Sequence, residues 1–162
     1  MFRALIICFT IIFSTVPSYA NTVKLQTGTF IPLLLAQTIE SGTLQNGDDV
    51  FFSVAMDIKV NSKTVIQAGT LVTANVTQIQ KSGMIGQGGT FTVSFIQTTA
   101  IDGQQIMLRG NKTWAGDDET TGTVVVGVVL CPLALLNSGE EAQAGEGAQV
   151  RAIVGASYDI KT

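Results

Sequence analysis

The sequence has 162 residues, no histidine and a formal net charge of −3, and 46% of its residues are hydrophobic. Without histidine, the Ser-His-Asp and Cys-His triads, zinc sites that use histidine and histidine general bases are all excluded. The acidic balance opposes binding to a phosphate backbone, so we expect no nucleic-acid partner.

The first 20 residues predict a cleavable secretory signal peptide. Arg3 gives a short positive start, residues 4–13 form an apolar run, and Ser18-Tyr19-Ala20 predicts cleavage after Ala20. A retained membrane anchor is the alternative, but the run is shorter than the roughly 20 residues that span a bilayer. We therefore expect an exported protein of the periplasm or cell envelope, in which residues 21–162 form a single domain.

Cleavage after Ala20 removes Arg3 and Cys8, which leaves 142 residues with 8 basic and 12 acidic side chains and a net charge of −4. Cys131 is then the only cysteine, and one thiol cannot form an internal disulfide. Its apolar neighbours favour a packing role over a catalytic one. The fold must therefore be stabilised by burial of apolar side chains alone.

The remaining sequence predicts strands separated by turns. The expected strands, in chain order, are residues 30–39, 50–60, 64–67, 71–80, 90–101, 104–109 and 149–160. Pro32 lies near the start of the first of these and has no N–H to donate, so we expect that end of the strand at a sheet edge. Residues 83–89, with the sequence GMIGQGG, are expected to form a loop.

Alternation of apolar and polar residues is clearest over residues 50–60. Every second side chain there is apolar, which predicts one strand with a buried face made of Phe52, Val54, Met56, Ile58 and Val60.

The same alternation places Phe91, Val93 and Phe95 on one face, and it slips by one position over residues 96–101, which predicts a β-bulge. Asp102-Gly103 is a hairpin signal between this strand and the next, where Ile106 and Leu108 lie on one face. A Gly-Thr pair at residues 28–29, 69–70 and 89–90 is expected to supply a turn and then begin a strand.

We therefore expect an all-β fold: a small antiparallel β-barrel or sandwich of about six to eight strands, with a short apolar segment or helical turn late in the chain. That apolar segment, residues 123–136, contains no charged residue. One interpretation is a central strand buried in the core and followed by a helical turn. The other is an exposed element that contacts a membrane or a partner. The residues of the possible interaction surface are Val124, Val125, Val126, Val128, Val129, Leu130, Leu133, Leu135 and Leu136.

Two other features suggest sites, but each has a simpler structural explanation. The acidic groups at residues 48–49 and 117–119 lack the spacing of a calcium loop and are expected to be solvated, so we expect no metal and no cofactor. Trp114 follows the polar residues 111–113, which indicates a loop. Partial burial of Trp114 against the barrel rim is favoured over stacking on a sugar.

The strand motifs, taken in order, resemble a known family. They are Gly28-Thr-Phe-Ile-Pro-Leu-Leu-Leu35, Thr38-Ile-Glu-Ser-Gly42, Val65-Ile-Gln-Ala-Gly-Thr70, Phe91-Thr-Val-Ser-Phe95 with Ile101-Asp-Gly103, and Val150-Arg-Ala-Ile-Val154. Together they resemble the periplasmic barrel of the TrbI-type scaffold protein of type IV secretion and conjugation core complexes. The resemblance implies a stand-alone relative of a barrel that forms a ring beneath the outer membrane. It also implies that residues 123–136 correspond to the apolar insertion that contributes to the membrane pore.

We therefore expect a non-enzymatic, exported envelope protein that serves assembly or protein interaction. Its expected partners are envelope proteins or further copies of itself, with peripheral contact to the outer membrane. The alternative is a module that binds a small apolar or carbohydrate ligand inside the barrel. An enzyme that uses carboxylates such as Glu40 or Asp57 is a third hypothesis, but no spacing in the sequence pairs them.

Overall fold

The structure is a computed structural model, and it describes residues 22–83, 87–116 and 139–162. These residues form thirteen β-strands, so the all-β prediction is confirmed. Within the described ranges, no helix is long and apolar enough to cross a membrane.

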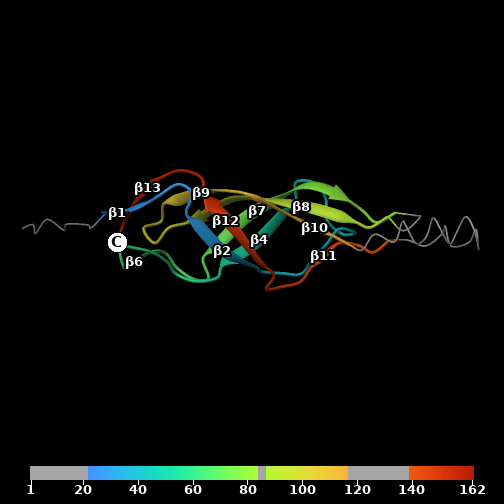
Figure 1. Cartoon of the computed structure of the whole chain (residues 1–162), viewed down its shortest axis with the longest axis horizontal. Coiled ribbons are helices and arrows are strands. Elements are labelled where there is room, and N and C mark those ends of the chain that lie inside the picture. Colours follow the sequence, from blue (N-terminus) through green and yellow to red (C-terminus); the bar gives the residue numbers. More distant parts are fainter. Residues whose placement is uncertain (1–21, 84–86, 117–138) are drawn as a thin grey trace, which may run out of the picture.

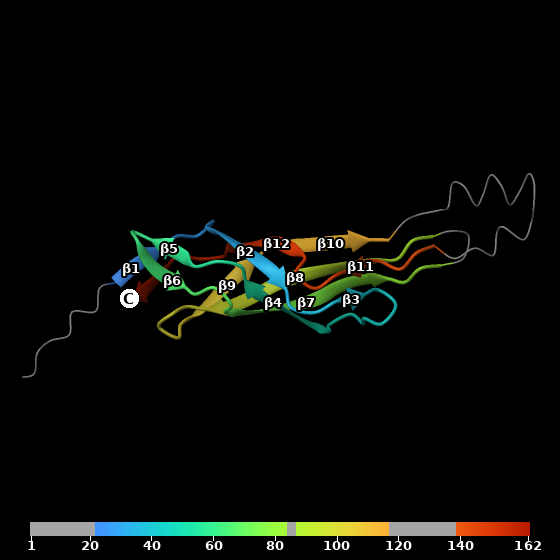
Figure 2. The ribbon, with the colours of Figure 1, turned by 90° about the horizontal axis from the view of Figure 1, so that it is seen from below.

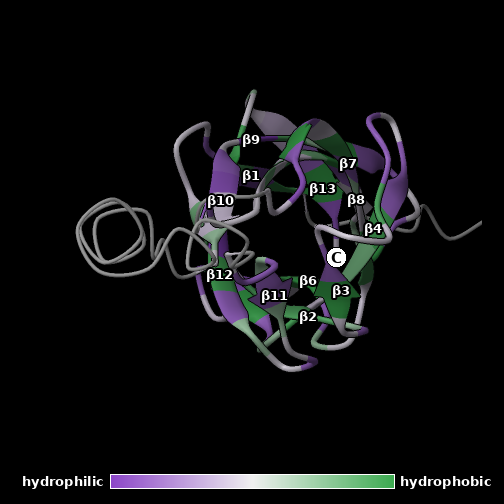
Figure 3. Ribbon diagram, turned by 90° about the vertical axis from the view of Figure 1, so that its right-hand side faces the viewer, coloured by the Kyte–Doolittle hydropathy of each residue, from purple (hydrophilic) through white to green (hydrophobic). Residues whose placement is uncertain are grey.

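Six antiparallel strands form a closed barrel (Figures 1 and 3). In order around the wall they are β8 (Thr90–Thr99), β7 (Leu71–Gln80), β4 (Asp49–Val54), β2 (Phe30–Leu35), β12 (Gln149–Val154) and β9 (Gln105–Arg109). The barrel closes because β9 pairs with both β12 and β8. A seventh strand, β10 (Asn111–Ala115), extends the sheet on β8 beyond the closed wall.

Three two-stranded pairs cover the two ends of this elongated molecule (Figure 2). At one end, β1 (Thr22–Leu25) pairs with β13 (Tyr158–Lys161), and β5 (Ile58–Val60) pairs with β6 (Lys63–Ile66). At the other end, β3 (Ile39–Glu40) pairs with β11 (Gln143–Ala144). The far ends of β7, β8 and β10 lie at this second end as well.

The core fills the inside of the barrel because alternate residues of each strand point inward. On β2, for example, Ile31, Leu33 and Leu35 are buried while Phe30 is exposed. The rings of Phe52 and Phe95 meet edge to face across the interior, with their centroids 5.3 Å apart. Such aromatic pairs stabilise a core beyond the area they bury.

The single strand predicted for residues 50–60 is wrong. β4 ends at Val54, β5 begins at Ile58, and the side chain of Met56 is 59% exposed instead of buried. The physical reason lies on the neighbouring strand, because Pro32 accepts a hydrogen bond from the Ala55 amide (2.9 Å) but has no N–H to return. The β4 strand therefore leaves the sheet at this point.

The edge predicted at Pro32 is present on one side only. β2 lies inside the barrel wall, and Pro32 is paired with Arg151 of β12. On the β4 side, however, the pairing covers Leu33–Leu35 and stops before Pro32. The edge is therefore local to residues 30–32, and β2 as a whole is not an edge strand.

The bulge and the hairpin are both confirmed. The pairing of β7 with β8 shifts where Ile96 is inserted, so that Phe95 and Thr98 are buried while Ile96 is exposed. β8 and β9 then form an antiparallel hairpin across Asp102 and Gly103.

The Gly-Thr pairs at residues 28–29 and 69–70 form the same turn. Gly28 and Gly69 have φ angles of +84° and +78°, which only glycine adopts without strain. In both turns the threonine N–H and hydroxyl bond to the carbonyl three residues earlier. The expectation that glycine supplies the turn is confirmed for these two pairs, but β2 and β7 begin one residue after the threonine, at Phe30 and Leu71.

Candidate functional site

The predicted interaction surface, Val124 to Leu136, lies outside the described residues, so the structure does not test it. What the structure does describe is the place where that segment leaves and rejoins the barrel. The last described residue before it is Gly116, directly after β10, and the first one after it is Gly139, which precedes β11. We call this region, formed by Ser41, Ser82, Gly83, Gly89, Gly116 and residues 139–142, the insertion base.

Main-chain hydrogen bonds join the two sides of the insertion base. The Gly116 N–H donates to the Gly89 carbonyl (2.8 Å), and the Gly89 N–H donates to the Glu140 carbonyl (2.8 Å). A third bond runs from the Gly139 N–H to the Gly83 carbonyl (3.2 Å). Residues on both sides of the apolar segment are therefore fixed to the β7–β8 hairpin end, and through Gly89 to each other.

The carboxylate of Glu141 lies at the centre of the insertion base. It accepts hydrogen bonds from the hydroxyls of Ser41 and Ser82 and a third from the Ser82 N–H (3.2 Å). Ser41 is fully buried, and its hydroxyl oxygen also accepts a bond from the Ala142 N–H (2.9 Å). One carboxylate therefore connects the residues just before β11, just after β3 and just after β7, which lie far apart in the sequence.

Hydrogen bonds from Ser41 and then from Ser82 hold the pKa of the Glu141 carboxyl below its ordinary value. Hydrogen bonds to the charged form favour ionisation, and here they outweigh the opposing effect of partial burial. Lys81 adds a smaller attraction, and its Nζ donates to the Gly42 carbonyl (2.9 Å). Glu141 is therefore ionised at neutral pH, and its negative charge lies among hydrogen-bond donors.

The glycines of the insertion base are required by packing. A Cβ atom at Gly89 would overlap the Ser41 hydroxyl, one at Gly116 would overlap the Glu140 carbonyl, and one at Gly139 would overlap the main chain at Gln87. Because main-chain atoms cannot move aside as a flexible side chain can, Gly116 and Gly139 are the positions least able to change.

Trp114 lies on β10 beside the insertion base and not in a loop, so the loop assignment is wrong. Its ring stacks on Phe91 with the centroids 5.1 Å apart, and the Lys112 Nζ lies 5.8 Å from the Trp114 ring centroid. The predicted partial burial of Trp114 against the barrel is confirmed. This stack anchors β10 to β8 directly before Gly116.

The other predicted sites do not form a chemical centre in the part of the chain that the structure describes. No three acidic or cysteine side chains of these residues come together where they could hold a metal ion. Asp48 accepts a bond from the Gln45 N–H and Asp49 from the Asn75 side chain, while Asp57 accepts one from the Ala68 N–H. Asp117–Glu119 and Cys131 lie outside the described residues.

A ligand inside the barrel was the alternative hypothesis, and the inward positions of the described strands are filled by side chains. Phe52, Phe91, Leu33 and Ile106 are among the fully buried residues of one continuous core cluster. The ligand hypothesis stays a prediction, and the packed core gives no observation in its favour.

Sequence reasoning missed the insertion base. Ser41 and Glu141 are 100 positions apart in the chain, so no local pattern joins them. The only signal was that glycines flank the apolar segment and that a further glycine-rich stretch, residues 83–89, lies elsewhere in the chain.

The closed six-stranded antiparallel barrel with one additional strand defines the class of fold. A similar solved structure is that of ComB10 of the Com type IV secretion system of Helicobacter pylori, which is 12% identical to this chain with a TM-score of 0.46. The match covers 84% of this chain and 89% of ComB10. No protein-family model matches the chain, and no curated protein sequence matches it significantly. Membership of the TrbI-type family therefore stays a prediction from the strand motifs.

Proposed function

We propose that this protein is a non-enzymatic assembly module of the cell envelope, which presents the apolar segment of residues 123–136 to a partner, to another copy or to the outer membrane. The observation that carries the proposal is the insertion base. Main-chain bonds at Gly89 and the hydrogen bonds of Glu141 hold both sides of the segment on one end of the barrel.

A flexible segment loses conformational freedom when it binds a partner, and this loss opposes binding. An apolar segment whose two ends are already fixed loses less conformational freedom on binding than one attached by a single end. The apolar residues themselves then supply the free energy of association by leaving water. A barrel with a packed core and a fixed insertion base is suited to this task and needs no catalytic group.

The test is a double substitution, Val126→Asp and Val129→Asp, with the mass of the protein measured by light scattering in buffer and with lipid vesicles. We expect the wild-type protein to self-associate or to bind vesicles, and the double variant to do neither while its thermal unfolding is unchanged. The matched control is Leu71→Asp with Ile101→Asp, because both side chains are exposed on the described surface (57% and 46%).

Two outcomes contradict the proposal. If the double variant unfolds while the control variant stays folded, the segment belongs to the core. If wild type and double variant are both monomers that ignore lipid, the segment has no role in assembly.

A further inference from the structure

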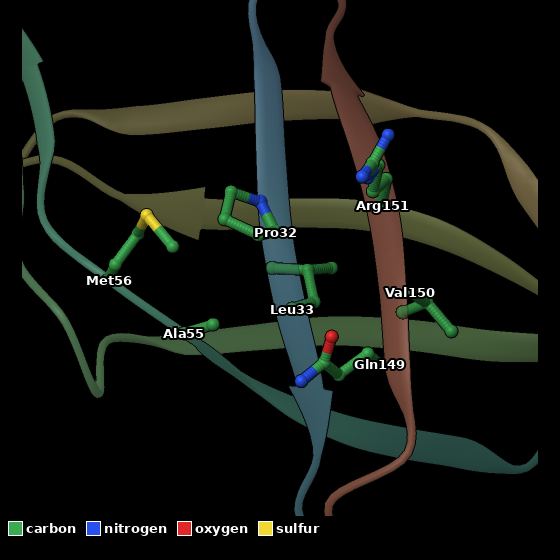
Figure 4. A pocket seen from close by; sticks show the side chains of 7 residues that line it. All are labelled: Pro32, Leu33, Ala55, Met56, Gln149, Val150 and Arg151. Atoms are coloured by element: carbon green, nitrogen blue, oxygen red, sulfur yellow. The ribbon is translucent and has the colours of Figure 1, made fainter.

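A groove of about 360 Å³ lies on the outer wall of the barrel, where β4 leaves β2 (Figure 4). Pro32 and Leu33 of β2 lie between Met56 on one side and the residues of β12 on the other. The lining residues are Pro32, Leu33, Ala55, Met56, Gln149, Val150 and Arg151. The groove exists because Pro32 ends the pairing between β2 and β4, so the chain turns away at Ala55.

Further exposed apolar side chains lie on the outer face of the barrel, on β2, β12 and β9. Phe30 is 64% exposed and is paired across the strands with Ile153, so the two side chains lie on the same outer face. Met107 is 63% exposed and lies on the next strand, where its carbonyl accepts a bond from the Gly155 N–H. We call Met56, Pro32, Phe30, Ile153 and Met107 the outer apolar band; it extends from the segment after β4 across β2 and β12 to β9.

Two arginines lie beside residues of the outer apolar band. Arg151 is the cross-strand partner of Pro32, and Arg109 is the cross-strand partner of Ile153. They are the only arginines in residues 21–162 of a chain with a net negative charge. Asp57, next in sequence to the lining residue Met56, accepts a hydrogen bond from the Ala68 N–H (2.9 Å) and keeps its negative charge. The lining itself contains one charged side chain, the cation Arg151, among apolar residues and Gln149.

The main chain of β2 also has hydrogen-bonding groups that point toward the side from which β4 turns away. In an antiparallel ladder, the N–H and C=O of alternate residues point to opposite neighbours. Leu35 bonds toward β12, so by alternation Phe30 and Pro32 direct their main-chain groups toward the β4 side. There the Pro32 carbonyl accepts the Ala55 N–H (2.9 Å), and the pairing of β2 with β4 covers only Leu33–Leu35. By the same alternation, the main-chain groups of Phe30, two residues before the lining residue Pro32, face the side from which β4 has turned away. Sites that bind an extended peptide use main-chain groups of this kind.

We infer that this groove binds an extended segment of a partner protein that carries apolar side chains and at least one carboxylate. Arginine binds carboxylates through two parallel hydrogen bonds, and arginine, methionine and phenylalanine are enriched where proteins contact each other. The inference goes beyond the proposed function, because the groove lies on the side wall and uses none of the residues of the insertion base.

The experiment is a selection of displayed random octapeptides on the purified protein, carried out in parallel on the variant Arg151→Glu. We expect wild type to enrich peptides that combine Asp or Glu with apolar residues. Synthetic peptides of those sequences should bind Arg151→Glu at least tenfold more weakly, and selection on the variant should shift toward Lys or Arg. The control Lys59→Glu makes the same charge change on β5, outside the groove, and should bind as wild type does.

Several results would overturn the inference. One is enrichment without acidic residues, and another is equal affinity of the acidic peptides for wild type and Arg151→Glu. Binding to vesicles of phosphatidylglycerol and phosphatidylcholine that Arg151→Glu abolishes, with no peptide enriched, would assign the groove to a lipid surface. A dimer that Arg151→Glu abolishes would assign it to a second copy.

If Arg151→Glu does not fold, Arg151→Gln removes the charge without reversing it, and it carries the same prediction of weaker peptide binding. Failure of the proposed function is seen separately, because Val126→Asp with Val129→Asp leaves the groove unchanged and should bind the selected peptides as wild type does.

Discussion

In the barrel wall, buried apolar side chains such as Phe52 and Phe95 pack against each other. The insertion base is instead joined by main-chain hydrogen bonds at Gly89 and by two serine hydroxyls that donate to the Glu141 carboxylate. The free energy gained by burying apolar side chains is proportional to the buried area and does not depend on direction. The barrel wall should therefore tolerate substitutions that keep the volume of its core. Hydrogen bonds and close main-chain contacts depend on position. The two regions should therefore respond differently to the same kind of substitution.

The outer groove shows what happens where the regular wall is interrupted. One residue without an N–H, Pro32, stops the pairing with β4 and leaves apolar side chains on the outside. The barrel itself stays closed because β12 continues to pair with β2 over residues 30–34. A local interruption can therefore create a surface site without opening the core.

The largest effect is expected in the wall. Phe52→Ala removes a fully buried ring that contacts Phe95, and should lower the free energy of unfolding by about 3 to 5 kcal/mol. Chemical denaturation followed by circular dichroism measures this loss. The matched control, Phe51→Ala, lies next to it on the outer face and should cost less than half as much. Equal costs for the two would mean that the described core is not where the stability resides.

A smaller and more local effect is expected at the insertion base. Gly116→Ala places a methyl group against the Glu140 carbonyl, which must move, at a cost of about 1 to 3 kcal/mol. Because Gly116 is outside the barrel wall, we expect faster proteolysis between residues 116 and 139 before any global unfolding. Gly145→Ala is the control, since open space surrounds that position. Equal proteolysis rates for the two variants would show that the base does not restrain the segment.

The sequence predicts the parts of the fold that depend on neighbouring residues better than the parts that depend on contacts between distant residues. The sequence predicted β7 with its bounds, a bulge within residues 96–101, and the shared face of Ile106 and Leu108, which is buried, because each signal lies within one strand. β10 was missed since most of its residues are exposed, so it has no apolar face to detect. The break at Ala55 was missed because its cause, Pro32, is on another strand.

The candidate site was predicted least well for a related reason. The sequence identifies an apolar segment at residues 123–136, but the Ser41, Ser82 and Glu141 side chains that fix its base come from three distant parts of the chain. Hydrophobic periodicity reports local geometry, and it carries no information about which distant polar groups will meet. The outer groove is hidden for the same reason, because its lining comes from β2, from β12 and from the residues that follow β4.

The smallest effect, and the sharpest test of the insertion base, is expected for Glu141→Gln. The substitution keeps the size of the side chain but removes the charge that the Ser41 and Ser82 hydroxyls contact, and should cost about 1 kcal/mol at pH 7. Hydrogen bonding lowers the pKa of Glu141 in the folded protein, so its contribution is complete above the unfolded pKa of about 4.3 and is lost as pH falls through the lower, folded value. The difference in stability between wild type and Glu141→Gln should therefore be constant from pH 7 to about pH 5 and shrink below about pH 4.

Thermal unfolding of both proteins from pH 7 to below pH 4 measures this difference, with Glu140→Gln as the control for loss of a neighbouring carboxylate. If the difference does not change with pH, or if Glu140→Gln behaves in the same way, the carboxylate of Glu141 does not hold the base together.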